Sequence, residues 1–227
     1  MFGTFQGEEE GRKIPETEWA YVQKWMKKTI DDLKGSWLKV TSSMNKVAKS
    51  EETKIDEMRK SIKNDVRKEV DRLKKQANDE ELDIRECLSE VSDGGEALAK
   101  SLLKGAMQCI TDEAKKSQKL VSSEEALVKE VKTLWQNART GWDKCQSSHN
   151  VIGCRGKLVA EAETKEDKFT NKEGQLMSEA ATLVNKLQSE TDYCVTSELA
   201  SVPAALADTF STMEKCVKKL HVKKKAD

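Results

Sequence analysis

The sequence predicts an all-α protein, an elongated bundle of about six amphipathic helices stapled by up to three disulfides. Three observations support this fold class. The 227 residues include only two prolines and eleven glycines, a composition typical of long helices. Apolar residues recur at steps of three and four, and no strand-like alternation is long enough for a sheet. Six cysteines, an even number, lie near the expected helix turns.

The chain is expected to begin with a flexible acidic tail, residues 1–13, which has no periodic apolar pattern. Ile14-Pro15-Glu16 then looks like a helix start, because proline is pre-set for the first turn and carboxylates stabilise the positive end of the helix dipole. Gly35 weakens this helix, and its pattern fades beyond Val40. Its apolar stripe consists of Trp19, Val22, Trp25, Met26, Ile30, Leu33 and Trp37.

A second helical stretch is expected near Ser50, which marks either a new start or a continuation. Acid–base pairs four residues apart, such as Asp56 with Lys60, indicate that most of its circumference faces water. Apolar residues continue to Asp93-Gly94-Gly95, the clearest break in the chain. The apolar stripe of this stretch is narrow and consists of Ile55, Met58, Ile62, Val66, Val70 and Leu73.

Four more helices are expected after this break. Glu96 begins the third, and Ser122-Ser123-Glu124-Glu125 is a candidate cap for the fourth. A polar loop, residues 146–153, precedes a long fifth helix, and Pro203 begins the sixth.

These elements are expected to form one helical domain, residues 14–222, which could divide into halves 14–93 and 94–222. Residues 223–227 would be a basic tail.

The cysteines are Cys87, Cys109, Cys145, Cys154, Cys194 and Cys216. No two of them have the C-x-x-C spacing that is typical of zinc or thioredoxin chemistry. Disulfides persist mainly outside the cytosol, so the cysteines favour a secreted, extracellular protein. Such a protein would have lost its signal peptide, because the N-terminus here has no apolar signal-peptide core. Free buried thiols are the alternative.

Cys145 and Cys154 form the pair that helix geometry favours, because they flank one short loop. Closing that loop stabilises the fold by roughly 2.5 kcal/mol in the chain-entropy model. Cys87 and Cys109 differ in height by on the order of 10 Å relative to their turn, which is too far for a bridge. The other four cysteines are therefore expected to join helices that are distant in sequence.

One interval repeats: the separation between Cys87 and Cys109 equals the separation between Cys194 and Cys216. The repetition arises either by chance or from a duplicated helical hairpin.

Metal binding and catalysis are not expected. Cys145, His149 and Cys154 could supply three zinc ligands, but all three come from one short loop, and an exposed histidine beside a disulfide is the preferred interpretation. The glycine patterns of nucleophilic, phosphoryl and hydride chemistry are missing. The sequence therefore predicts a protein that is not an enzyme, with no catalytic residue, metal or cofactor.

The tryptophans are expected to fill the core where the first and fourth helices cross, with at least one of them partly exposed. The alternative is a cavity lined by indole rings that holds an apolar or cationic ligand. As candidates for a ligand cavity or an interface, they are Trp19, Trp25, Trp37, Trp135 and Trp142.

The basic C-terminal end is expected to be a solvated tail at the negative end of a helix dipole, with contact to an anionic surface as the alternative. Its lysines are Lys218, Lys219, Lys223, Lys224 and Lys225. The whole chain has 40 basic and 40 acidic residues, so nucleic acid is not an expected partner. No apolar run approaches the roughly 20 residues that a transmembrane helix needs.

The spacing of the cysteines from Cys109 to Cys216, on helices rich in Lys, Glu and Ala, resembles that of two secreted all-helical insect families. These are the mosquito thirty-four-kilodalton salivary family and the TsetseEP-type proteins. The resemblance covers about residues 87–220. It implies a non-enzymatic binding protein from saliva, gut or haemolymph, and it carries over no binding residues.

The leading functional hypothesis is a secreted helical protein that binds a protein partner, such as an arthropod salivary factor acting on the host or the feeding apparatus. The first alternative is a carrier of a lipid or small apolar ligand in an aromatic-lined helical cavity. The second is an intracellular coiled-coil protein with reduced thiols. The stripe from Ile55 to Leu73 drifts from strict heptads, which counts against this last hypothesis.

Overall fold

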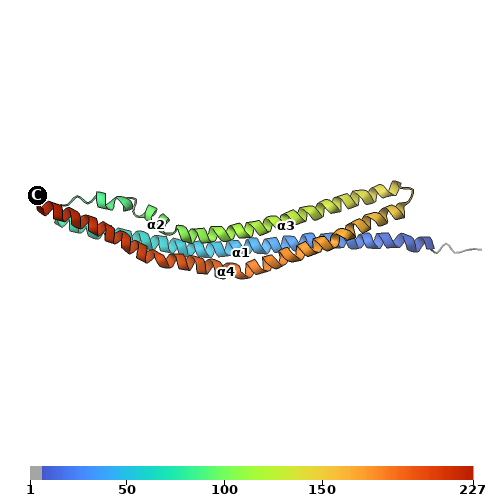
Figure 1. Ribbon diagram of the computed structural model, residues 1–227, viewed down its shortest axis with the longest axis horizontal. Coiled ribbons are helices and arrows are strands. Elements are labelled where there is room, and N and C mark those ends of the chain that lie inside the picture. The colour runs from blue at the N-terminus through green and yellow to red at the C-terminus, as the bar shows by residue number, and fades with distance from the viewer. Residues whose placement is uncertain (1–6, 227) are drawn as a thin grey trace, which may run out of the picture. The chain divides into compact units, whose positions relative to one another are not determined.

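A computed structural model describes residues 7–226, apart from the side chains of residues 7–15, 90 and 225–226. The described part of the chain is all-α, as predicted, and contains no strand. Within the described residues, four α-helices are joined by three segments, two of which include a 3₁₀ helix, at Glu86–Val91 and Cys145–Ser147 (Figure 1). The helices are α1 (Gly7–Asp79), α2 (Glu96–Leu102), α3 (Lys104–Lys144) and α4 (Val151–Ala226).

The prediction of about six helices is wrong because three expected boundaries lie inside longer helices. Ser50 is within α1, Ser122 is within α3 and Pro203 is within α4. Gly35 likewise leaves α1 unbroken. A glycine inside a helix costs about 1 kcal/mol, and a local cap signal favours a helix end by a similar amount. Both effects are small, and buried residues continue on both sides of each of these positions.

Pro203 is the strongest of these helix-breaking signals, because its ring prevents a hydrogen bond to the carbonyl of Leu199 and costs about 3 kcal/mol or more. The proline itself is exposed, whereas Val202 and Leu206 near it are buried. Burying such a pair contributes roughly 1.5–3 kcal/mol for each side chain, so α4 continues through the proline.

The ends of the first and last helices also differ from the expected tails. α1 begins at Gly7, so residues 7–13 are helical, while residues 1–6 lie outside the described part of the chain. α4 continues to Ala226, so the lysines from Lys223 onward belong to a helix.

The chain divides into two units that interleave along the sequence. Unit 1 contains residues 1–43 and 116–185, and unit 2 contains residues 44–115 and 186–227. The units therefore do not coincide with the halves 14–93 and 94–222.

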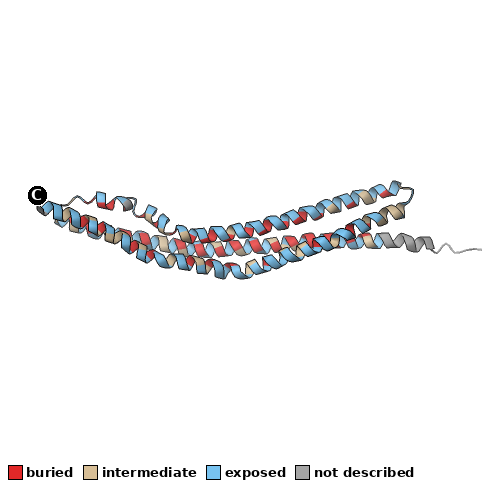
Figure 2. Ribbon diagram, in the orientation of Figure 1, coloured by how far each residue is buried: buried red, intermediate tan, exposed pale blue. Residues whose placement is uncertain are grey.

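Unit 1 is a three-helix arrangement in which segments of α1, α3 and α4 lie side by side (Figure 1). Buried positions recur along each helix between exposed ones (Figure 2). One core cluster includes Trp19, Trp25 and Phe169, and a second is formed around Val40 and Ala180. The apolar stripe predicted for the start of α1 is thus the side that α1 buries.

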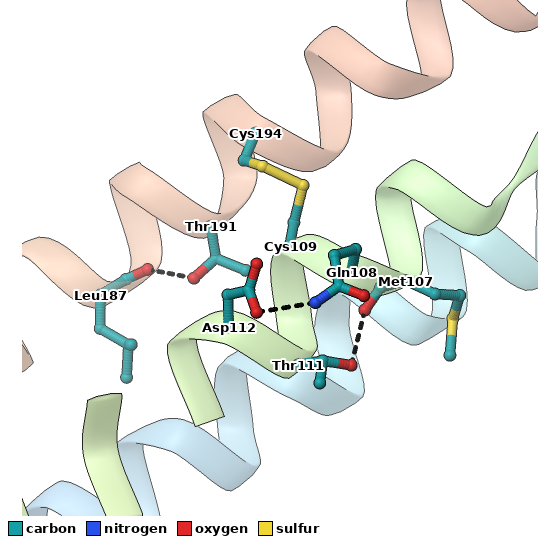
Figure 3. Close-up of a disulfide and its surroundings, with 8 residues drawn as sticks. All are labelled: Met107, Gln108, Cys109, Thr111, Asp112, Leu187, Thr191 and Cys194. Atoms are coloured by element: carbon teal, nitrogen blue, oxygen red, sulfur yellow. Dashed lines mark hydrogen bonds between the residues drawn. A yellow bond between two sulfur atoms is a disulfide. The ribbon is translucent and has the colours of Figure 1, made fainter. Parts of the chain in front are cut away.

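Unit 2 contains two of the three disulfides. Cys87 is bonded to Cys216 and Cys109 to Cys194, with Cα–Cα distances of 5.6 and 5.9 Å. Figure 3 shows the second bridge between α3 and α4, one helical turn from the buried Thr191. The hydroxyl of Thr191 donates a hydrogen bond to the Leu187 carbonyl at 2.6 Å.

The break expected at Asp93-Gly94-Gly95 is present as a turn, and α2 begins directly after it. Both glycines have positive φ, +73° and +81°, a conformation in which other residues are strained. The Asp93 carboxylate accepts hydrogen bonds from the backbone N–H groups of Gly95 and Ala97, at 3.1 and 2.8 Å. A side chain at position 95 would also approach Val66 within 3.0 Å.

The two bridges of unit 2 connect the two equally spaced cysteine pairs, since Cys87 is bonded to Cys216 and Cys109 to Cys194. The interval from Cys87 to Cys109 contains a 3₁₀ helix, the glycine turn and α2, whereas the interval from Cys194 to Cys216 lies within α4. The two intervals are therefore not copies of one helical hairpin.

Candidate ligand-binding groove in unit 1

One end of unit 1 is closed by a disulfide and a stack of aromatic rings. Cys145 and Cys154, the pair favoured by the short loop, are bonded across the turn between α3 and α4. Nearby, Trp19 stacks on Trp142 with ring centroids 4.8 Å apart and planes 10° from parallel. The guanidinium carbon of Arg155 lies 4.4 Å from the centroid of the Trp142 ring, in a cation–π contact.

A groove between α3 and α4, called here the α3–α4 groove, extends along unit 1 and has a volume of about 670 Å³. Two polar, uncharged residues of α3, Thr133 and Asn137, also line it. Its apolar lining comes from both helices and consists of Ala126, Leu134, Ala138, Leu158, Ala162 and Phe169.

Phe169 connects the lining of this groove to the core. Its ring is 7% exposed and lies 6.3 Å, centroid to centroid, from the ring of Trp25. Ala138 and Ala162 are also buried in the same core cluster. Because the lining is part of a packed core, the groove is held in shape without a ligand.

The rim of the groove is charged. Lys129, Lys165 and Lys168 line it, and all three are exposed. Glu130 and Glu161 supply the negative charges, and Glu130 is paired with Lys172 of α4 at 3.3 Å.

The tryptophans predicted as cavity residues do not line this groove. Trp19 and Trp25 are buried in the first core cluster, and Trp142 packs against it. Trp37 packs against the second cluster, and Trp135 is 36% exposed. The groove has one aromatic residue in its lining, Phe169. Two of its lining residues, Leu134 and Ala138, belong to the apolar stripe that periodicity predicts for this part of α3, whereas Ala126 and Thr133 lie outside that stripe.

The predicted basic end of the chain is part of unit 2. Lys218, Lys219 and Lys223 are exposed. Lys224 donates hydrogen bonds to the carbonyl oxygens of Glu80 and Glu81, at 2.7 and 3.4 Å. The side chain of Lys225 lies outside the described residues.

The two histidines do not form a metal site. His149 is exposed in the turn before α4, and His221 is paired with Glu80. Within the described part of the chain, no group of three or more His, Cys, Asp or Glu side chains is placed to hold a metal ion.

A buried carboxyl group lies in unit 1, away from the groove lining. Glu124 of α3 is 0% exposed, although the sequence assigned it to a helix cap. Burial raises the pKa of Glu124, and the Ser36 hydroxyl partly offsets this rise in pKa. Neither carboxylate oxygen makes a geometrically regular hydrogen bond to the described residues.

Comparison of the chain with protein-family models, with curated proteins and with solved structures gives no match. No helix among residues 7–226 has the length and the apolar content needed to cross a membrane.

Proposed function

We propose that this chain is a secreted, non-enzymatic binding protein that carries a small apolar ligand in the α3–α4 groove. The observation that carries this proposal is the apolar groove of about 670 Å³ described above. Small-molecule sites typically have volumes of roughly 300–1,000 Å³ and are lined mainly by apolar side chains with a few polar groups. The groove has a volume in this range, and six of its thirteen lining residues are apolar, while five of the other seven are charged residues of the rim.

A second groove of similar size, in unit 2, is less suited to an apolar ligand. It also has a volume of about 670 Å³, but four of its eight lining residues are charged. These are Arg59, Glu96, Lys100 and Lys104. Arg59 is paired with Asp56 and Glu96 with Lys63, so Lys100 and Lys104 are the charged groups from which an apolar ligand would remove water at a cost in free energy.

Secretion is proposed from the three disulfides, because such bonds persist mainly in oxidising compartments. The resemblance to insect salivary and TsetseEP-type proteins stays a prediction that rests on cysteine spacing.

Binding of a protein partner also stays a prediction. Along each helix the exposed large apolar side chains of the described residues lie far apart, as Tyr21 and Leu38 do on α1. Met107 of α3 and Tyr193 of α4 both lie beside the Cys109–Cys194 bridge, where they make a small group and not a broad patch. A protein-binding surface more often gathers such side chains into one patch.

The proposal is tested by titration with N-phenyl-1-naphthylamine, a neutral apolar dye that fluoresces when it leaves water. The wild-type chain is expected to bind this dye. Thr133→Phe fills the groove from an exposed position and should weaken binding at least tenfold. Thr140→Phe is the matched control, since Thr140 is exposed on the same helix and does not line the groove.

Circular dichroism of both variants checks that the helices are intact. Absence of dye binding by the wild type, or equal loss of binding in the two variants, would overturn the proposal.

A further inference from the structure

We infer that the ligand of the α3–α4 groove is a long-chain carboxylate, a molecule with an aliphatic chain and one anionic head. This inference rests on the proposed function and specifies its ligand class. Three features of the groove carry it: rim lysines that make no ion pair with the described residues, the position of two of these lysines at one end, and an apolar lining that continues toward the other end.

The rim lysines have no ion-pair partner among the described residues. Lys129, Lys165 and Lys168 make no ion pair within 4.0 Å to any of these residues. Of the two rim glutamates, Glu130 is already paired with Lys172, which leaves Glu161 as the unpaired negative charge in the described rim. The unpaired charges of this rim are thus three positive and one negative, in a chain whose formal net charge is zero.

The helix rise places two of the lysines at a similar level. Lys129 precedes Cys145 on α3, and Lys168 follows Cys154 on α4. At a rise of about 1.5 Å per residue, they lie roughly 24 and 21 Å from the disulfide that ties α3 to α4. Because the Cα atoms of that disulfide are 5.7 Å apart, both lysines reach the same end of the groove.

The two ends of the groove therefore differ in charge. Its far end has Lys129 and Lys168, together with Glu130, whose charge is paired with Lys172. Its near end, within roughly 11 Å of the disulfide, has Leu158, Ala138 and the unpaired Glu161. A carboxylate would lie beside the two lysines, and its aliphatic chain would extend along the apolar lining toward Leu158. In the reverse orientation the carboxylate would lie beside Glu161 and would be repelled.

The length of the lining also fits a long chain. From Ala126 to Ala138, α3 advances by roughly 18 Å. A short acid would leave much of this apolar surface in water, so affinity should rise with chain length.

The test compares three ligands with the same sixteen-carbon chain: palmitate, hexadecan-1-ol and hexadecylamine. Each displaces N-phenyl-1-naphthylamine from the wild-type chain and from two double variants. K129A/K168A removes the far-end lysines. K119A/K132A removes two exposed lysines of α3 that do not line the groove, so it makes the same change in net charge.

Palmitate should bind the wild type roughly threefold to tenfold more tightly than hexadecan-1-ol, as expected for partly exposed ion pairs. This preference should disappear in K129A/K168A and persist in K119A/K132A, and hexadecylamine should bind most weakly. Equal binding of palmitate and hexadecan-1-ol by the wild type would overturn the inference and leave the proposed function intact. Loss of the preference in both double variants would also overturn it. If none of the three ligands and no dye binds, the proposed function itself is wrong.

Discussion

Opening the Cys87–Cys216 disulfide should destabilise the protein more than opening Cys145–Cys154 does, although less than its separation in sequence indicates. The perturbation is the paired substitution of Cys87 and Cys216 by alanine. The two cysteines are 129 residues apart, and an isolated loop of that length corresponds to about 5 kcal/mol in the chain-entropy model.

The relevant loop is shorter because the disulfides are nested. While Cys109–Cys194 remains closed, opening the outer bridge frees only the two segments that lie between the bridges, from Cys87 to Cys109 and from Cys194 to Cys216. Together these segments make a loop of about 44 residues, which corresponds to about 4 kcal/mol. For Cys145–Cys154, whose separation is 9 residues, the same relation gives about 2.5 kcal/mol.

Urea denaturation in non-reducing buffer, followed by circular dichroism, measures both losses. The free energy of unfolding should fall by about 4 kcal/mol in C87A/C216A and by about 2.5 kcal/mol in C145A/C154A. Tryptophan fluorescence gives a second readout for C145A/C154A, because all five tryptophans lie in unit 1. A loss in C145A/C154A that equals or exceeds that in C87A/C216A would refute the nested-loop reasoning.

Three further substitutions test the packing. Glu124→Gln should stabilise the fold at pH 7 and have no effect below about pH 4.5, because burial raises the folded-state pKa of Glu124 above its ordinary 4.5 and penalises only the ionised form. Urea titrations at both pH values measure the change in the free energy of unfolding, and equal changes at the two pH values would contradict this prediction. Pro203→Ala should raise the thermal midpoint by restoring a helix hydrogen bond and removing the clash of the proline ring, which together cost about 3 kcal/mol, and a lowered midpoint would count against a strained proline. Arg155→Ala should cost about 1 kcal/mol by removing its contact with Trp142 and its ion pair with the exposed Glu16, whereas an unchanged urea midpoint would mean that these two contacts contribute nothing.

The helical character of the chain could be predicted because periodicity reports directly on which face a helix buries. The stripe from Trp19 to Leu33 is buried, and the turn at Gly94-Gly95 requires the positive φ that glycine allows. Helix boundaries such as Pro203 could not be predicted, because local breaking signals were outweighed by packing between distant segments.

The disulfide pairs could be predicted only in part from the sequence, and the groove could not be predicted from it. The Cys145–Cys154 pair follows from one short loop, but the two other pairs depend on the register of segments 85 and 129 residues apart. The α3–α4 groove depends on small side chains such as Ala126 and Ala138, which leave space between two helices. Periodicity identifies the direction in which a side chain points and does not give the distance to the next helix.

Isotope-filtered NMR with carbon-13-labelled palmitate and unlabelled protein shows whether the α3–α4 groove holds an aliphatic ligand, because it identifies the side chains that touch the acyl chain. We predict contacts from the chain to Leu134, Leu158 and the ring of Phe169. Contacts confined to Leu103 and Met107, which line the second groove in unit 2, would contradict the claim.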